Sequence, residues 1–465
     1  MIKKYFGSLD FNKKTLKIAV PLMLQQLISN SVTLVINLMI GGLGDSALAG
    51  VAAVNRFFMI SSYGTNGAIS ASTVFIAQYY GAKNTERVKA SFRFSVLVSC
   101  IVMGLSIIPA LLIPKTIISF IVKDPAVIEQ GYLYIKIASL SFIPNMISLP
   151  IVAAMRATGD TKTPLFSAIL SFSSNVVLNL LLIYGNLGFP QLGLMGGAVS
   201  LLTSRIIELA FLSLALVRGN YSFTTKIREL FEIPVDLVKH MLSKMIPLTT
   251  SEIFWAIGLT LLLKFYATRG PDVVTGYSIA STISDLFFTM NAGMAVSCTL
   301  LVAQPLGSGK LELAKENGYR IIGFAILMSM VFGTLLFASS FTVPLLYDVS
   351  PSSEEVAVSF LRIMSLFFSI YVLNTTHYCV LRAGGDMTST MVLESGHMWL
   401  VNLTAVGFAT HFTNLPIIPL YIIGQCTDLI KLGIAHYLVK RENWVVSLTN
   451  HSNLNEAILD ELPSL

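Results

Sequence analysis

MRATGD at residues 155–160 and LRAGGD at residues 381–386 are two copies of one segment. They lie 226 positions apart, since 382 minus 156 is 226. The same shift aligns other landmarks without a gap over about 140 residues: Pro21-Leu22 falls on Pro247-Leu248, Gly44 on Gly270, Gly50 on Gly276, Gly67 on Gly293, Ala77-Gln78 on Ala303-Gln304, Gly81 on Gly307, Glu86 on Glu312 and Lys89 on Lys315. Self-similarity at a fixed distance is typical of a repeated structural unit. We therefore predict that the chain consists of two copies of one unit.

The composition indicates a membrane protein. Hydrophobic residues make up 54% of the 465 residues and charged residues only 12%, whereas a soluble chain carries about a quarter charged residues. The excess lies in long apolar runs such as residues 95–113 and 321–346. About 20 helical residues span a hydrocarbon core of about 30 Å. The sequence therefore predicts an all-α integral membrane protein.

The N-terminal residues and the cysteines indicate which features the protein lacks. Residues 1–17 carry five lysines and precede a full-length span, so we expect no cleavable signal peptide. The cysteines lie isolated within apolar runs and indicate neither a disulfide framework nor a metal site. They are Cys100, Cys298, Cys379 and Cys426.

We expect twelve transmembrane helices, six in each copy. Their approximate ranges are 15–41, 48–80, 90–113, 128–155, 162–186, 192–217, 241–267, 274–306, 316–346, 354–382, 388–411 and 415–440. Because each copy holds six helices, the two copies share one orientation and form two six-helix lobes related by pseudo-twofold symmetry. The predicted divisions are an N-lobe at 1–217, a cytoplasmic connecting loop at 218–240, a C-lobe at 241–441 and a cytoplasmic tail at 442–465.

The distribution of charge predicts the orientation in the membrane. The loops on one side, with both tails, carry 22 lysines and arginines, whereas the opposite loops carry only Lys115, Lys123, Arg269 and Arg362. The positive-inside rule places the cation-rich side in the cytoplasm. We therefore expect a multi-pass protein of the plasma (inner) membrane with both termini cytoplasmic.

Further stretches accompany the repeated segment. MIGGLG at residues 39–44, followed by Ala47-Leu48-Ala49, ends the first helix, and RATGDTKTP at residues 156–164 follows the fourth. With the Pro-Leu openings of the first and seventh helices, they resemble the multidrug and toxic compound extrusion (MATE) family over nearly the whole chain. The resemblance implies two lobes around a central cavity, with Na⁺ or H⁺ entry driving the export of organic, often cationic, compounds.

The same resemblance shapes the expected partners. It implies a transporter rather than an enzyme, with no cofactor or metal site besides the coupling ion, Na⁺ or H⁺. We expect small organic substrates and the lipid bilayer as partners, no nucleic acid, and a monomer.

The chain departs from the family at several positions that carry charge in other members. Where many members have an Asp in the first helix, this sequence has Ile36, followed by Asn37. The fifth-helix Asn and Asp of some members fall on Asn175 and Asn179, and a tenth-helix carboxylate falls near Tyr371. The coupling residues of the family therefore cannot be transferred to this chain as a set.

Three acids lie inside the expected spans of the C-lobe: Glu252, Asp285 and Glu394. A charged side chain at the middle of the bilayer costs at least about 3 kcal/mol, so such acids indicate function. Polar residues accompany them at helical spacing. These are Ser281 and Thr289 near Asp285, His397 and Asn402 near Glu394, and the cluster Asn374, His377 and Tyr378. The aligned N-lobe positions are neutral: Gln26, Met59 and Ala168.

This asymmetry leads to a hypothesis of divided roles. Glu252, Glu394 and Asp285 would bind the coupling cation in the C-lobe. The substrate cavity would be lined by Gln26, Asn37, Asn175, Asn179, Trp255, Tyr371, His377 and Trp399. Oxygen ligands suit Na⁺, and a desolvated carboxylate equally takes up H⁺, so the sequence leaves the ion open.

Structural roles are the alternatives for the same residues. The acids can form buried pairs with Lys264 or a histidine. The asparagines can hold helices together, and the tryptophans can serve packing. Arg156 with Asp160, and Arg382 with Asp386, are expected to cap or tether helix ends, since Arg and Asp four residues apart can pair on one face.

Other functions remain open at this stage. A lipid-linked oligosaccharide flippase of the same superfamily needs several cations in its spans, and this chain has few. A membrane-embedded enzyme needs a catalytic constellation, and the sequence contains no nucleophile elbow, no His-x-x-x-His pair and no phosphate-binding loop. A channel is the least favoured, because pores commonly arise from oligomer symmetry.

Overall fold

The structure is a computed structural model that describes residues 4–342, 347 and 349–449. Within these ranges it describes all side chains except those of Val32, Thr33, Leu34, Asn37, Leu38, Asp45 and Ile227. Residues 343–346, at the end of one predicted span, therefore lie outside the described residues. The same holds for the side chain of the predicted cavity residue Asn37.

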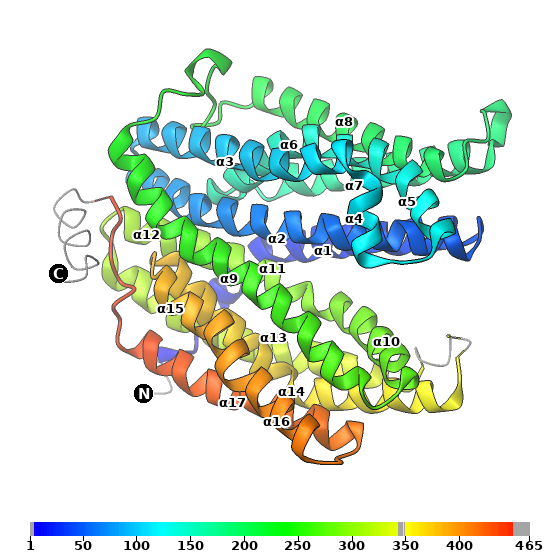
Figure 1. Cartoon of the computed structure of the whole chain (residues 1–465). Helices are drawn as coiled ribbons and strands as arrows, with labels where there is room; N and C mark the ends of the chain where they lie inside the picture. The colour runs from blue at the N-terminus through cyan, green and yellow to red at the C-terminus, as the bar shows by residue number, and fades with distance from the viewer. Residues whose placement is uncertain (1–3, 343–346, 348, 450–465) are drawn as a thin grey trace, which may run out of the picture. The chain divides into compact units, whose positions relative to one another are not determined.

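Helices joined by loops make up the described chain, and the connection between Arg218 and Val235 is the longest of those loops that are fully described (Figure 1). In chain order they are α1 (Leu9–Gly41), α2 (Asp45–Gly81), α3 (Thr85–Leu112), α4 (Pro114–Ile121), α5 (Pro125–Ala138), α6 (Phe142–Ala157), α7 (Lys162–Tyr184), α8 (Leu194–Arg218), α9 (Val235–Ala267), α10 (Pro271–Phe288), α11 (Met290–Cys298), α12 (Gln304–Gly307), α13 (Leu311–Ser339), α14 (Pro351–Ala383), α15 (Met387–Met391), α16 (Leu403–Phe412) and α17 (Ile417–Lys440). Short 3₁₀ or π-helical turns connect or interrupt them: η2 (Ser139–Ser141), η3 (Asn186–Gly188), η4 (Ile227–Glu229), η5 (Thr299–Ala303), η7 (Val392–Gly396) and η8 (Met398–Asn402).

The predicted all-α fold with twelve spans is confirmed. Nine segments of the described chain are long and apolar enough to cross a membrane, among them the continuous runs Pro125–Ala157 and Pro271–Gly307. The other three long helical segments are α1, α2 and the run from Met387 to Phe412. Each of the twelve corresponds to one predicted helix.

Several helices begin about five or six residues before the predicted start, and one helix was not predicted. Helix α9 begins at Val235 rather than at residue 241, and α4 lies where the sequence analysis predicts a loop. A search for apolar runs misses both, because the first turns of α9 are polar and α4 is short. Pro114 occupies the first turn of α4, where its fixed φ and missing N–H suit a helix start.

The chain divides into two compact units. Unit 1 takes in the described residues of Met1–Met23, Ala77–Lys83 and Ser243–Leu465, and unit 2 takes in Leu24–Ile76 and Asn84–Leu242. Unit 1 thus combines most of the second copy of the repeat with two short pieces of the first. The lobe boundaries drawn from the repeat stay a prediction.

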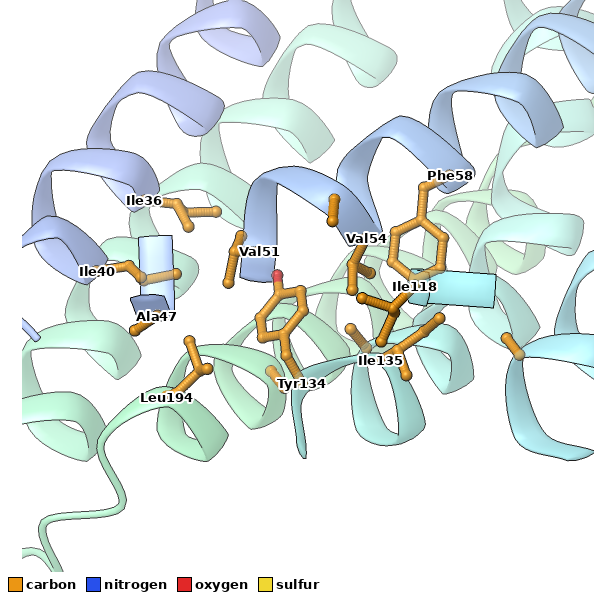
Figure 2. Packing of buried hydrophobic residues seen from close by; sticks show 14 of the residues in the cluster. Ile36, Ile40, Ala47, Val51, Val54, Phe58, Ile118, Tyr134, Ile135 and Leu194 are labelled. Carbon is orange, nitrogen blue, oxygen red and sulfur yellow. The ribbon is translucent and has the colours of Figure 1, made fainter. Parts of the chain in front are cut away.

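An apolar cluster to which each helix from α1 to α8 contributes forms the core of unit 2; Figure 2 shows part of it. Ile40, Val51 and Ile118 are fully buried within it. Glycine permits a close approach of α2 and α5, since a Cβ added at Gly50 would lie 2.7 Å from the backbone nitrogen of Gly131. Packing of this density leaves no room for an additional side-chain atom there.

In unit 1 the end of α2 crosses α12 in direct backbone contact. A Cβ at Gly81 would clash with the carbonyl group of Gln304, and a Cβ at Gly307 would clash with that of Gln78. The two contacts are equivalent by the repeat, because residues 78 and 81 shifted by 226 become 304 and 307. Reciprocal contacts of this kind arise around a twofold axis.

The segment at residues 442–449 packs against the same part of unit 1. Trp444 is fully buried, and its indole nitrogen donates to the carbonyl of Val439 at 3.0 Å. The backbone nitrogen of Leu448 donates to Oε1 of Gln78 at 2.8 Å, while Nε2 of Gln78 donates to the carbonyl of Ala383 at 3.1 Å. The predicted tail therefore begins with a packed segment, and residues 450–465 lie outside the described residues.

Replacing Gly307 with Ala is expected to destabilise unit 1 by about 1–3 kcal/mol, the usual cost of overpacking. The added methyl group would force the backbones of α2 and α12 apart. The loss is measurable as a lower thermal unfolding temperature of the detergent-solubilised protein. Gly104→Ala in α3 is the matched control, because no atom lies within 4 Å of a Cβ at that position. Equal unfolding temperatures for both variants would contradict the prediction.

Candidate functional site

The repeated segment at residues 381–386 contributes to a polar network inside unit 1. The Tyr378 hydroxyl donates to Oε1 of Glu252 at 3.2 Å and accepts from Nη1 of Arg382 at 2.6 Å. Nη1 of Arg382 lies 3.8 Å from Oε1 of Glu252. Tyr378 and Arg382 are four residues apart on α14, so they share one helical face that is turned toward α9.

A second acid lies next to this network. Nζ of Lys431 on α17 donates to Oε1 of Glu394 on η7 at 2.9 Å, and the side chain of Lys431 is largely buried. Glu394 is close enough to Glu252 to interact with it electrostatically. The structure therefore brings together two of the three predicted coupling acids, and each has a cationic partner. The partners are Arg382 and Lys431, not Lys264 or a histidine.

A third carboxylate near this network, Asp428 on α17, is absent from the sequence-based set. Its side chain interacts electrostatically with Lys431 and Glu394. Its backbone carbonyl accepts from Nδ2 of Asn374 at 3.0 Å. The sequence does contain a signal for this acid: Asp428 and Lys431 lie three residues apart within the apolar run of α17. The sequence analysis counted only the lysine.

Two other predicted polar residues anchor helices to α17. Nε2 of His397 lies 2.9 Å from the carbonyl of Thr427. Nδ2 of Asn402 donates to the carbonyl of Gly424 at 3.0 Å and to Oγ1 of Thr427 at 2.8 Å. The face of α17 that carries Asp428 and Lys431 is thus held by the segment that carries Glu394.

Asp285 lies on α10, and its side chain is exposed. The hydroxyls predicted to accompany it bond to their own helix instead. Oγ of Ser281 donates to the carbonyl of Ser278 at 3.1 Å, and Oγ1 of Thr289 donates to that of Leu286 at 2.8 Å. Both hydroxyls of the predicted polar stripe therefore donate to the backbone of their own helix, and the coupling role of Asp285 stays a prediction.

Three of the predicted cavity residues of unit 1 contact different parts of the unit. His377 is buried, and its Nδ1 lies 2.8 Å from the carbonyl of Leu373 on its own helix. The Tyr371 ring packs on that of Phe288 with centroids 4.4 Å apart. The Trp399 indole nitrogen donates to the carbonyl of Phe254 at 3.0 Å, which ties η8 to α9. Trp255 is half-buried on α9.

In unit 2 the two predicted asparagines act together. Nδ2 of Asn179 donates to Oδ1 of Asn175 at 2.9 Å, and Nδ2 of Asn175 donates to Oγ of Ser204 at 3.3 Å. Both asparagines are buried where α7 packs on α8. Gln26 is instead exposed on α1, where its Nε2 donates to Asn30 at 3.1 Å. The arrangement matches the helix-joining alternative for the asparagines.

Unit 2 also contains a buried acid that the sequence analysis missed. Glu208 on α8 is 7% exposed and pairs with Nη1 of Arg205 at 2.7 Å. Arg156 is near enough to Glu208 for an electrostatic interaction, and its Nη2 donates to Oε1 of Gln25 at 2.7 Å. The spacing of three residues between Arg205 and Glu208 within an apolar run is the signal that could have revealed the pair.

The acidic ends of the two repeated segments cap helices, as predicted. Oδ1 of Asp160 accepts from the backbone nitrogens of Lys162 and Thr163, each at 3.1 Å, and Oδ1 of Asp386 accepts from that of Ser389 at 3.0 Å. The Arg–Asp pairing that led to this expectation is not found among the described residues. Arg156 bonds to Gln25, and Arg382 bonds to Tyr378.

Comparisons with known proteins agree with this architecture. The MatE family matches residues 21–181 and 247–404. "Probable multidrug resistance protein YoeA" of Bacillus subtilis is 24% identical over 425 residues, which cover 87% of this chain and 88% of that protein. "Probable multidrug resistance protein NorM" of Halalkalibacterium halodurans is 26% identical over 436 residues, covering 91% and 92%.

Solved structures share the fold. One described as an outward-facing multidrug resistance MATE family transporter of the MOP superfamily has a TM-score of 0.84 at 18% identity, with 98% of each chain covered. A MOP superfamily transporter from Pyrococcus furiosus has a TM-score of 0.85 at 18% identity, covering 96% of this chain and 98% of that one. The family match and the long apolar helices together define a multi-pass membrane transporter. The chain belongs to the MATE family, since the two matched ranges span more than half of its length.

The cap at Asp160 predicts a dependence of stability on pH. Burial alone would raise the pKa of Asp160, but hydrogen bonds from Thr163, from the Tyr221 hydroxyl and from the backbone outweigh it and hold the pKa below its usual value. A carboxyl with a lowered pKa stabilises the folded state above its unfolded pKa of about 4 and loses this effect as pH falls through the folded value. Asp160→Ala should therefore lower the stability by about 1 kcal/mol at pH 7.

Thermal unfolding in detergent at pH 7 and below pH 4 checks this. The difference between wild type and Asp160→Ala should shrink on acidification. Asp10→Ala is the control, since Asp10 is an exposed residue of the first turn of α1. A difference that is the same at both pH values would contradict the assignment.

Proposed function

We propose that the chain is a secondary active exporter of organic, mainly cationic, compounds, driven by antiport of Na⁺ or H⁺ with alternating access. Family membership supports transport, and relatives that carry the name multidrug resistance protein support the class of substrate. The observation that carries the coupling is the network of Glu252, Glu394 and Asp428 with Arg382 and Lys431 in unit 1.

The charge of this network favours one monovalent cation. Three carboxylates face two cations, so one negative charge remains when all five groups are ionised. An uncompensated charge in an apolar interior costs several kcal/mol. Binding of one Na⁺ or one H⁺ would neutralise the set, and its release would restore the charge.

Both ions fit the groups that are present. The carboxylate oxygens of Glu252 and Glu394 and the side-chain oxygen of Asn374 are hard donors of the kind that bind Na⁺. Protonation of one carboxylate removes the same negative charge. The same groups can therefore bind either ion.

The substrate side of the proposal rests on aromatic residues of unit 1. Trp255, Tyr371 and Trp399 can stack on a cationic or aromatic compound. The protein would act as a transporter without enzymatic activity, cofactor or nucleic acid, and as a monomer.

A lipid-linked oligosaccharide flippase is less consistent with the structure. A polyanionic headgroup needs free cations in the spans. Arg205 is held by Glu208 at 2.7 Å, and Lys431 by Glu394 at 2.9 Å. Two of the few cations in the spans are therefore already compensated.

Expression in a cell depleted of its own exporters should lower the accumulation of ethidium, and dissipating the Na⁺ or H⁺ gradient separately should show which one drives export. Glu252→Gln and Glu394→Gln should each reduce the ion-dependent rate at least about tenfold, equivalent to about 1.4 kcal/mol, because they remove charge from the site. Glu129→Gln is the control, since Glu129 is an exposed acid that pairs with Lys115. Wild-type rates in both site variants would disprove the coupling role.

We also propose that the chain lies in the plasma (inner) membrane with both termini cytoplasmic. Single cysteines at Asn84, between α2 and α3, and at Lys123, between α4 and α5, test this in an otherwise cysteine-free chain. A membrane-impermeant maleimide added to intact cells should label position 123 and spare position 84. The reverse pattern would show the opposite orientation.

A further inference from the structure

The hydroxyl of Tyr378 lies between Arg382 and Glu252. Its hydroxyl accepts from Nη1 of Arg382 at 2.6 Å and donates to Oε1 of Glu252 at 3.2 Å. Arg382 itself stops 3.8 Å from the same oxygen. The hydroxyl thus bridges the guanidinium of Arg382 and the carboxylate of Glu252, which do not form a direct hydrogen bond.

The separation of Arg382 and Glu252 is longer than a direct charge-assisted hydrogen bond. Charge-assisted hydrogen bonds between a cation and a carboxylate close to about 2.7–2.9 Å. Lys431 and Glu394 in the same unit do so at 2.9 Å. At 3.8 Å the pair of Arg382 and Glu252 lies beyond hydrogen-bond distance. Glu252 is therefore only partly compensated.

The repeat supplies an internal comparison. Arg156 corresponds to Arg382, and the position of Tyr378 is occupied by Val152, since 378 minus 226 is 152. A valine side chain forms no hydrogen bond. Arg156 reaches α1 directly, with Nη2 2.7 Å from Oε1 of Gln25. Where valine replaces the tyrosine, the arginine thus bonds directly to the partner helix, through Gln25, the neighbour of the position that corresponds to Glu252.

We propose that Tyr378 is a positioning residue of the coupling site, which holds Arg382 away from Glu252 and leaves this carboxylate open to the exchangeable cation. The proposal rests on the coupling function assigned to Glu252 above. Among the described residues, Arg382 is the one cation within 4.0 Å of Glu252. Glu394 faces Glu252 as a second acid, and Lys431 is engaged with Glu394. The position of Arg382 therefore decides how strongly Glu252 attracts an ion.

Tyr378→Phe removes the hydroxyl and preserves the ring. Arg382 should then close onto Glu252 and compete with the coupling ion. Ethidium efflux is measured against the concentration of the driving ion, Na⁺ or H⁺, as established for the wild type. The concentration that gives half-maximal efflux should rise about tenfold, with the maximal rate unchanged. Tyr378→Val, which copies Val152 of the other half, should give the same shift.

The second arm removes the arginine. The double variant Arg382→Gln/Tyr378→Phe should have the same half-maximal ion concentration as Arg382→Gln alone. Without the guanidinium, the Tyr378 hydroxyl has no cation to hold away from Glu252. Tyr266→Phe is the matched control. Tyr266 is also buried in unit 1, its hydroxyl has no hydrogen-bond partner among the described residues, and its loss should not move the ion dependence.

Loss of folded protein lowers the maximal rate but does not move the half-maximal concentration, so misfolding does not imitate the expected result. A shift that persists in the Arg382→Gln background would overturn the positioning role. So would an unchanged ion dependence in Tyr378→Phe while Glu252→Gln abolishes it. If wild-type efflux depends on neither Na⁺ nor H⁺, the coupling function and this inference are both wrong.

Discussion

Compensation of charge in an apolar interior is the constraint on which the polar part of this structure depends. An unpaired charge there costs several kcal/mol, so each buried cation needs an acid or a set of hydrogen bonds. Arg205 meets Glu208 within unit 2, and Lys431 meets Glu394 within unit 1, at 2.7 and 2.9 Å. These pairs join residues of neighbouring turns or helices. The departures from full compensation, such as Glu252, are accordingly the places where an ion can act.

The duplicated framework separates what both halves need from what each half does. Asp160 and Asp386 cap the helix that follows each repeated segment, so the turn is preserved in both copies. The arginine four residues earlier is also preserved, but its surroundings have diverged. Arg156 bonds to a neutral amide, whereas Arg382 faces an acid through a hydroxyl. At these positions the two copies therefore differ in the side chains that surround the conserved arginine.

Sequence reasoning was reliable where a signal is local. The spans follow from the length of apolar runs, and the caps follow from Asp at the end of each repeated segment. It failed where a role depends on how a helix is rotated about its axis. Asp428 and Glu208 lie on faces turned into their units, while Asp285 is exposed on α10. Rotation is determined by packing against other helices, and the apolar content of a membrane span does not mark one face.

The end of α14 connects the charge network to the packing of unit 1. Arg382 belongs to the network, and the next residue, Ala383, offers its carbonyl to Gln78 near the end of α2. Gln78 in turn accepts from the backbone of Leu448 in the segment at residues 442–449. Arg382 is therefore one residue away from Ala383, which contacts the end of α2 where α2 crosses α12. Ion binding at Glu252 can therefore affect the backbone crossing of α2 and α12 through a short series of contacts. Each contact in this series is a hydrogen bond or a peptide bond.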